Sequence, residues 1–340
     1  MTRRCLTGLV LPAALLVVLA AVNLFAGSVA LPAGEVWDAL THPAATDATT
    51  AFIVRETRLP ALLTAAVAGA ALSVAGLVMQ TVFANPLADP SVLGVNAGAS
   101  LGAAVAMLLL GGTVATGGMV VSGFALTVAA AFAGALGVIV LLTLCSALLP
   151  DRLMLLIAGV MLSFLTSAFI SILNFYATTQ GVHAFTIWGL GDFSGTGTER
   201  LAPFAVAAGV GLLAALLLTK PLDALLLGDA YAAGVGIRVR RVRTLLLLTT
   251  GWLSAVVTAV CGPLSFIGLA VPHAARLALH TGSHRRLLPA TMLWGADAAL
   301  ACNALSHLPG PHGTLPLNAI TPLFGVPVVL WLLVRGRHHA

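Results

Sequence analysis

The sequence predicts an all-α membrane protein that crosses the bilayer about ten times, and two observations support this prediction. Of the 340 residues, 59% are hydrophobic and only 8% are charged, whereas a soluble domain carries roughly 25% charged residues. The charged residues also lie mainly between long apolar runs. A water-soluble globule is excluded because so few charged side chains would leave most of its surface apolar. Disorder is excluded because disordered chains have low hydrophobicity.

Ten apolar runs could form membrane spans, since a hydrocarbon layer of ~30 Å takes about 20 helical residues. They lie at 7–26, 59–83, 95–112, 118–148, 153–176, 201–219, 244–261, 264–280, 287–306 and 314–334. The fourth run is long enough to tilt or to include an interfacial turn. The eighth is the weakest because Pro272, His273 and Arg276 interrupt it. We therefore expect one transmembrane domain over 1–340, with a long loop at 220–243.

The first run has an alternative interpretation as a secretory signal. Arg3 and Arg4 precede it, and Ser28-Val29-Ala30 resembles a small-residue cleavage site. The apolar stretch is about 18 residues long, beyond the roughly 7–15 residues of a signal. We favour an uncleaved first helix.

Basic residues predict the orientation. If the N-terminus is cytoplasmic, thirteen of the sixteen basic residues fall in inner segments, and only Arg55, Arg58 and Arg200 fall outside. This bias follows the positive-inside rule and places both termini in the cytoplasm. It also accounts for the net charge of +5 without a nucleic-acid partner.

Small residues recur at helical spacing in two runs. Gly98 and Gly102 form a GxxxG pair, and Gly69 with Ser73 is its small-residue equivalent. Such pairs let helix backbones approach closely in lipid. A chain with 35 glycines also produces such spacings by chance.

The sequence shows no motif for nucleotide or metal chemistry. It contains no GxxxxGK[ST] phosphate loop around its only lysine, Lys220, and its cysteines are scattered singly, unlike a zinc site. His280 and His284 have i, i+4 spacing that could hold a metal, but beside two arginines an interfacial place is the simpler interpretation. We predict no metal site. The spans also lack a paired nucleophile and base, which argues against an intramembrane enzyme.

Two segments interrupt the helical pattern. Asn85, Pro86, Asp89 and Pro90 stand between two spans and predict a rigid turn. The segment 262–276 contains a further set of helix breakers: Gly262, Pro263 and Pro272. Such breaks at membrane depth are tolerated where protein or a water-filled cavity receives the freed backbone groups. Both segments are candidates for a pathway or gate, or for structural turns.

The loop at 220–243 combines glycines, an acid and a run of arginines. Asp229 can cap a short helix, for which Tyr231, Ala232 and Val235 offer an apolar face, with Gly228 and Gly236 bounding it. The arginines that follow are Arg238, Arg240, Arg241 and Arg243. They could meet an acidic partner surface or lipid head groups, or simply anchor the loop on the inner side.

These segments resemble the membrane permease of ATP-binding-cassette (ABC) importers for iron-siderophores, haem and vitamin B12. The supporting matches, in family order, are Arg58-Leu59-Pro60, Gly76 to Gln80, Trp188-Gly189-x-Gly191, Leu315-Pro316-Leu317-Asn318-Ala319-x-Thr321 and Gly325-Val326-Pro327. They extend from about 55 to 335, nearly the whole chain.

The resemblance implies a vitamin B12 importer permease-like fold in the bacterial cytoplasmic membrane. The permease would pair with a second copy or a paralogue, and the substrate path would lie at the dimer axis. Partner ATPase subunits would use ATP and Mg²⁺ inside, and a periplasmic or lipid-anchored binding protein would deliver the substrate. This chain would bind no cofactor and catalyse no reaction. Ferric siderophore is the first expected substrate, before haem and cobalamin.

The resemblance also implies roles for particular residues. The loop 220–243 would form short coupling helices that seat in a cleft of each ATPase. Binding proteins of the family dock through acidic residues onto permease arginines, for which Arg55, Arg58 and Arg200 are the candidates. The sequence departs from the family pattern at Ala61 and Ala301, where arginines often stand, and at Thr314, where an acid is common.

Asp297 lies midway along the ninth run, where a carboxylate costs roughly 2.5–3.5 kcal/mol on insertion scales. It is either a proton or cation site or a structural acid bonded to neighbouring helix groups, and the resemblance favours the second. An ion-coupled secondary transporter is the alternative function. Inverted repeats would support it, and Pro86-Leu87 followed by Leu93-Gly94-Val95 is faintly repeated in Pro263-Leu264 followed by Ile267-Gly268-Leu269. Against it, Asp297 is the only central acid, which is too few for a proton relay.

Overall fold

The computed structural model describes residues 6–91, 93–116, 119–148, 152–307 and 314–336. The helices are α2 (Leu11–Phe25), α3 (Ala33–Thr41), α4 (Ala48–Phe52), α5 (Leu59–Val82), α6 (Val95–Ala104), α7 (Phe124–Leu148), α8 (Arg152–Tyr176), α9 (Thr179–Gly189), α10 (Gly197–Leu217), α11 (Thr219–Leu226), α12 (Asp229–Gly234), α13 (Val239–Cys261), α14 (Ile267–Leu279), α15 (His284–Ser306) and α16 (Leu317–Gly336). Short π-helical segments are η1 (Leu6–Val10), η3 (Ile53–Arg58) and η4 (Val105–Leu109), and 3₁₀ turns are η2 (Pro43–Ala45) and η5 (Ser194–Thr196).

The expected all-α membrane fold is confirmed. Among the described residues, six helical segments are long and apolar enough to cross a membrane: Gly8–Phe25, Ala48–Val82, Phe124–Ser146, Leu153–Tyr176, Ser194–Leu217 and Val239–Cys261. Shorter apolar helices cover Val95–Leu109, Ile267–Leu279 and Leu317–Leu330. The remaining expected run, 287–306, lies in α15.

One expected span begins later than predicted. Strands β1 (Thr113–Thr116) and β2 (Met119–Ser122) pair antiparallel, so α7 starts at Phe124 instead of residue 118. The Thr- and Val-rich strand sequences favour extended backbone. Gly112 and Gly123, both at positive φ, close the hairpin through a 2.8 Å backbone hydrogen bond. The interfacial turn that the length of this run suggested is therefore a hairpin at its start.

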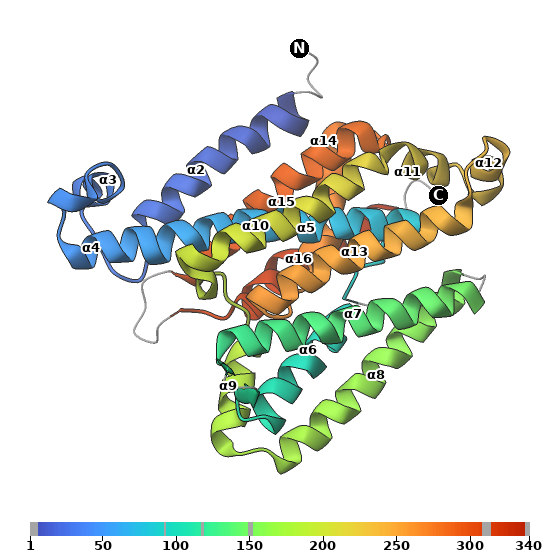
Figure 1. Cartoon of the computed structure of the whole chain (residues 1–340). Helices are drawn as coiled ribbons and strands as arrows, with labels where there is room; N and C mark the ends of the chain where they lie inside the picture. The colour runs from blue at the N-terminus through green and yellow to red at the C-terminus, as the bar shows by residue number, and fades with distance from the viewer. Residues whose placement is uncertain (1–5, 92, 117–118, 149–151, 308–313, 337–340) are drawn as a thin grey trace.

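Helix α5 forms the centre of the bundle (Figure 1). It packs against α10, α13, α14 and α15, and most of its side chains from Pro60 to Val82 are buried. A helix that is apolar all round, as α5 is, is stable when other helices surround it. Figure 1 shows α6 to α9 gathered on one side of this core, where α6 contacts α7, α8 and α9.

Glycine pairs mark the closest helix crossings. A Cβ placed on Gly69 would lie 2.1 Å from the Gly295 carbonyl oxygen, so α5 and α15 meet backbone to backbone. A Cβ on Gly98 would lie 2.6 Å from the Gly134 carbonyl oxygen, and one on Gly102 would lie 1.9 Å from the Ala130 oxygen. The small-residue spacings therefore mark helix contacts.

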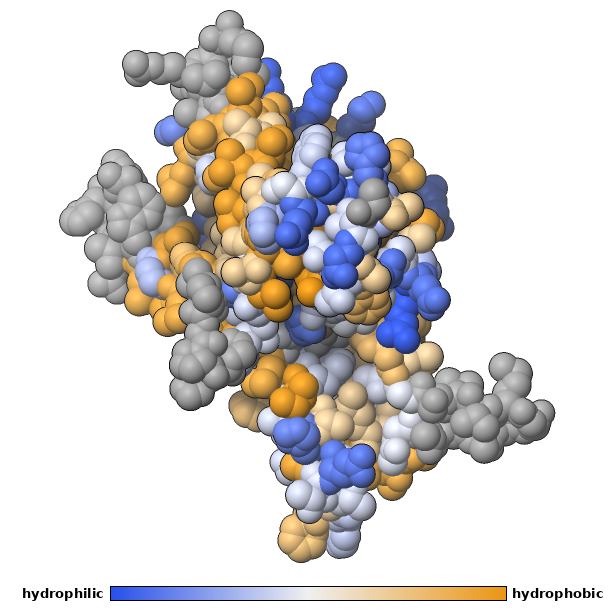
Figure 2. Space-filling view, turned by 90° about the vertical axis from the view of Figure 1, so that its left-hand side faces the viewer, coloured by the Kyte–Doolittle hydropathy of each residue, from blue (hydrophilic) through white to orange (hydrophobic). Residues whose placement is uncertain are grey.

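Helices α3 and α4 form one end of the molecule, and α12 lies at the other (Figure 1). Figure 2 views the α3–α4 end, where hydrophilic side chains gather over the middle of the face and hydrophobic ones lie beside them. Glu35, Asp38 and Asp47 are exposed here. We call the two ends the α3 end and the α12 end.

Candidate functional site

The helix break between α13 and α14 is held by protein hydrogen bonds. Residues 262–266 leave the helical pattern because Pro263 has no backbone donor, and Phe266 adopts a φ of +69°. The Asp192 backbone N–H donates to the Cys261 carbonyl at 3.0 Å, and the Asn96 amide donates to the Leu264 carbonyl at 3.2 Å. Protein groups therefore receive these two carbonyls at the break.

Asn96 joins this break to two helices. Its Oδ1 accepts hydrogen bonds from Ser254 Oγ and Thr258 Oγ1 of α13, both at 3.0 Å. The buried amide therefore has partners for both its donor and its acceptor, as buried polar groups require. We assigned Asn96 no role from the sequence, although a lone amide among Gly and Ala in an apolar run was a usable signal.

Helix α16 contacts the residues on the other side of the break between α13 and α14. Asn318 Nδ2 donates to the Gly189 carbonyl at 2.7 Å, and the Asn318 backbone N–H donates to the Leu190 carbonyl at 3.0 Å. Helices α6, α9, α13 and α16 therefore converge on residues 189–192 and 262–266. This bracing favours a structural turn at Gly262 and Pro263 in this conformation.

Pro272 does not break its helix, contrary to the expectation. Helix α14 continues through it from Ile267 to Leu279. Proline removes the hydrogen bond to residue i−4 and its ring crowds that carbonyl. Residue i−4 is here Gly268, whose carbonyl lies against Gly76 of α5. The break lies entirely N-terminal to α14.

Side-chain hydrogen bonds close the turn at 85–90. Asn85 Oδ1 accepts from the Leu87 N–H, and Asp89 Oδ1 accepts from the Ser91 N–H, both at 2.9 Å. His273 Nε2 lies 2.8 Å from the Pro86 carbonyl, which joins the turn to α14. Burial raises the pKa of the Asp89 carboxyl, against the lowering effect of its Ser91 hydrogen bonds. Pro90 is also buried.

Asp297 is buried without the hydrogen bonds expected of a structural acid. Neither carboxylate oxygen has a hydrogen-bond partner among the described residues. Asp297 lines an apolar cavity of about 300 Å³ between α2, α14, α15 and α16. The expectation that it bonds to neighbouring helix groups is therefore corrected for the part of the chain that the structure describes.

The loop 220–243 contains the two short helices α11 and α12. Gly228, at φ +102°, occupies the N-cap position of α12, and Gly236, at φ +86°, follows its end. Asp229 is therefore in the first turn and not at the cap, and its Oδ2 lies 2.7 Å from Arg243 Nη2. The predicted capping role of Asp229 is corrected to an ion pair between α12 and α13.

An exposed apolar patch lies on this segment. Leu226, Leu227, Tyr231 and Val235 are exposed, whereas Ala232 is fully buried. We call these four exposed residues the α12 patch. Ala232 instead holds α12 against the protein, which corrects its expected place on the partner-facing side.

The arginines after α12 differ in exposure. Arg238, Arg240 and Arg241 are exposed, and Arg243 is partly buried in its pair with Asp229. Helix α13 begins at Val239, five residues before the expected span at 244. Two of the exposed arginines therefore lie on the first turn of a helix.

The three arginines proposed for binding-protein docking also differ. Arg58 is only 8% exposed, and its guanidinium donates to the Leu24 carbonyl at 2.7 Å. It also reaches the Phe25 and Val29 carbonyls, so it caps the end of α2. Arg55 and Arg200 are exposed, and Arg200 lies 4.2 Å above the Phe124 ring. Arg58 therefore leaves the set of docking candidates.

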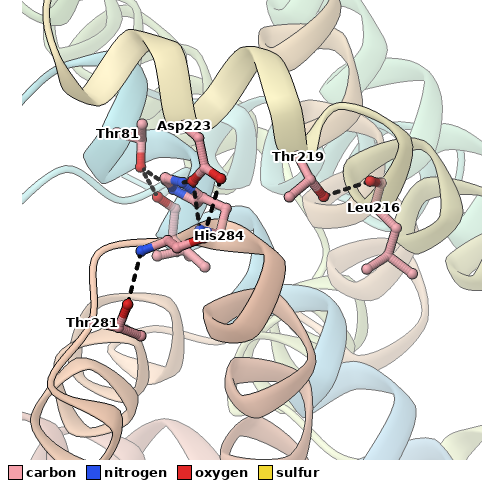
Figure 3. Close-up of polar contacts among 8 residues, drawn as sticks. Thr81, Leu216, Thr219, Asp223, Thr281 and His284 are labelled. Atoms are coloured by element: carbon pink, nitrogen blue, oxygen red, sulfur yellow. Dashed lines mark hydrogen bonds and ion pairs between the residues drawn. The ribbon is translucent and has the colours of Figure 1, made fainter.

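The two histidines with i, i+4 spacing do not share a site. His280 ends α14 and is exposed, whereas His284 begins α15 and is buried. No group of three or more potential metal ligands occurs within the described ranges. His284 instead joins a hydrogen-bond chain with Asp223 and Thr81, shown in Figure 3.

The model of the FecCD transport family matches residues 15–335. The chain belongs to this family. It is 35% identical over 336 residues to the vitamin B12 import system permease protein BtuC of Klebsiella pneumoniae, covering 99% of this chain and 95% of that protein. BtuC of Salmonella paratyphi A is 35% identical over 83% of this chain and 84% of its own length.

A solved structure supports the same family at the level of the fold. It is a metal-chelate type ABC transporter in an inward-facing conformation, with a TM-score of 0.82, 27% identity, and coverage of 95% of this chain and 97% of that one. This FecCD family member is thus a permease of the ABC importer class, in which ATP hydrolysis belongs to a separate subunit. It is a multi-pass inner-membrane protein.

Proposed function

We propose that this FecCD family member carries vitamin B12, or a chemically related metal chelate, across the cytoplasmic membrane. The observation that supports this most is the 35% identity to a vitamin B12 permease over 99% of the chain. The metal-chelate transporter that shares the fold supports the wider substrate class. We therefore place vitamin B12 first and ferric siderophore second, whereas the sequence alone placed ferric siderophore first. Haem is the third candidate.

We propose that the α12 patch seats in a cleft of a partner ATPase. A short helix bounded by two positive-φ glycines has a defined start and end. The largest side chain of the patch is Tyr231, which is 51% exposed. The exposed arginines beside the patch would complement an acidic surface on the partner. The ion pair between Asp229 and Arg243 would hold α12 in place against α13 during contact.

We propose that a binding protein docks at the α3 end through Arg55 and Arg200, which are exposed there. The acidic side chains of α3 and Glu56 give this face both signs of charge. A complementary partner surface would therefore carry basic as well as acidic groups. A second copy or a paralogue of this permease would complete the transport path.

Transport assays in proteoliposomes test the proposal. The permease is reconstituted with its co-expressed ATPase and binding protein, and uptake of cyanocobalamin is compared with uptake of a ferric hydroxamate. We expect ATP-dependent cobalamin uptake that stops without ATP. ATP-dependent uptake of the ferric hydroxamate alone would move the assignment to siderophores. Accumulation by the permease alone on a proton gradient would instead support the ion-coupled secondary transporter.

A further inference from the structure

Three elements that are distant in the sequence meet around one buried histidine. Helix α11 contributes Asp223, the start of α15 contributes His284, and the end of α5 contributes Thr81 (Figure 3). His284 is 1% exposed. Its ring lies between the other two side chains, with Nδ1 2.9 Å from Asp223 Oδ1 and Nε2 2.9 Å from Thr81 Oγ1.

Asp223 also caps α15 from a different helix. The first N–H groups of a helix have no partner within it, and the N-cap residue of α15, Ser283, makes no side-chain cap bond. Asp223 Oδ1 accepts from the His284 backbone N–H at 2.6 Å, and Ser283 Oγ donates to Asp223 Oδ2 at 3.2 Å. A carboxylate at this position also meets the positive end of the helix dipole. The N-terminus of α15 is thus fastened to α11.

The chemistry of these three side chains determines which atom donates in each hydrogen bond. An ionised carboxylate only accepts hydrogen bonds, so Nδ1 of His284 carries the hydrogen that faces Asp223. Nε2 of the neutral ring then accepts the hydroxyl hydrogen of Thr81, whose oxygen also lies 3.0 Å from the Leu77 carbonyl of its own helix, so this one hydrogen is shared between two acceptors. The chain from α11 to α5 is therefore continuous. Separately from this chain, Gln80 of α5 accepts from Arg276 Nη1 of α14 at 2.6 Å.

We propose that Asp223, His284 and Thr81 are positioning residues that transmit movement of α11 and α12 to the membrane helices α15 and α5. The inference rests on the proposed function, in which a partner ATPase moves the α12 patch. Apolar contacts between α11 and its neighbours allow sliding, whereas a chain of directional hydrogen bonds through a buried ring fixes both distance and orientation. Both α5 and α15 contact α11 directly.

Two substitutions of His284 cut the chain on opposite sides. In His284→Asn the amide nitrogen takes the place of Nδ1, which retains the Asp223 bond and removes the Thr81 bond. In His284→Gln the amide takes the place of Nε2, which retains the Thr81 bond and removes the Asp223 bond. Thr81→Val removes the hydroxyl at nearly constant volume. Asp223→Asn retains Oδ1, the atom that accepts both His284 bonds.

The readout is the number of substrate molecules transported per ATP hydrolysed by the whole complex in proteoliposomes. We expect His284→Asn, His284→Gln and Thr81→Val each to lower this ratio by about fivefold or more, with ATP hydrolysis near the wild-type rate. Asp223→Asn should retain the wild-type ratio, and Asp223→Leu should lower the ratio as the His284 variants do. His280→Asn, which changes an exposed histidine four residues away, is the matched control and should have no effect.

Double variants test whether the residues act as one chain. Adding Thr81→Val to His284→Asn should cause no further loss, because the bond that it removes is already absent. Additive losses, or uptake and ATP hydrolysis that fall in proportion, would overturn the proposal. If the complexes with His284 variants do not assemble, the Thr81→Val complex is the test. A wild-type number of substrate molecules transported per ATP by the Thr81→Val complex would overturn the proposal.

A variant of the α12 patch separates this inference from the proposed function. If Tyr231→Ala leaves both uptake and stimulated ATP hydrolysis unchanged, the proposed coupling surface is wrong. If Tyr231→Ala uncouples the complex while the His284 variants transport at the wild-type ratio, the coupling surface stands and only the hydrogen-bond chain is excluded.

Discussion

Arg243 Nη2 lies 2.7 Å from Asp229 Oδ2, so the first turn of α12 is paired with α13. The two side chains are 15% and 42% exposed, which places the pair partly in water. Exposed pairs contribute about 0.2–1 kcal/mol to stability. The importance of this pair therefore lies in the orientation of α12 more than in the stability of the fold.

Arg243→Gln should lower ATP-driven uptake while the complex still assembles, because α12 loses a partner that fixes it to α13. Arg286→Gln is the matched control, since Arg286 is an exposed arginine outside the α12 segment. The measurement is uptake in proteoliposomes beside the elution volume of the complex. Equal uptake in the two variants would show that the pair does not orient α12.

Gly236→Ala should impair coupling because an L-residue at a φ of +86° is strained by about 1–2 kcal/mol. Gly234→Ala, two residues earlier at the end of α12, has open space and no positive φ, so it serves as the control. Stimulation of ATP hydrolysis by the loaded binding protein is the readout. Full stimulation in Gly236→Ala would mean that the end of α12 can change shape without consequence.

Arg58→Gln should reduce thermal stability, since it leaves the carbonyls at the end of α2 without their charged donor. Loss of a single hydrogen bond to a charged group costs roughly 1.5–3 kcal/mol. Arg55→Gln, in contrast, should leave the melting temperature unchanged and weaken binding-protein affinity. Melting curves in detergent and surface plasmon resonance separate the two effects. Unchanged affinity in Arg55→Gln would remove Arg55 from the docking site.

Asp297→Asn should retain the fold and uptake, because it removes a buried carboxylate without partners among the described residues and retains its shape. Melting temperature and ATP-driven uptake are measured together. Loss of uptake in a stable Asp297→Asn protein would instead identify the carboxylate as a proton or cation site.

The predicted orientation is tested by cysteine labelling. Ala230→Cys and Gln180→Cys both place a thiol at an exposed position. Both are built in a variant that lacks the native cysteines. The arginine distribution predicts that a membrane-impermeant maleimide labels position 180 in intact spheroplasts and position 230 only after lysis. Labelling of position 230 in intact spheroplasts would reverse the topology.

The long helices could be predicted from the sequence because apolar runs report burial in lipid directly. Helices α3, α4 and α9 were not predicted, since the longest of them has 11 residues and no long apolar run. The β1–β2 hairpin was read as part of a span, because Val-rich strands and apolar helices look alike over a short window.

The candidate site was predicted less completely than the helices. The break at 262–266 contains Gly262 and Pro263, and α12 is bounded by Gly228 and Gly236. These residues could be found in the sequence because the backbone effects of Gly and Pro are local. The partners of Arg58 are backbone carbonyls about 30 residues earlier, which leave no sequence signal. Asp223 and His284 are 61 residues apart, and nothing in their neighbourhoods marks them as a pair. Contacts of this kind depend on the packing of the helices that carry them.

The crossing of α5 and α15 at Gly69 and Gly295 limits which motions the permease can make. Each glycine lies against the carbonyl oxygen of the other, so rotation of either helix about its own axis would drive a neighbouring side chain into that backbone. Close-packed interfaces of this kind change by discrete rearrangement and resist continuous deformation. Helices α5 and α15 are therefore expected to move together as one rigid body. Alternating access would then arise between this pair and the helices around it.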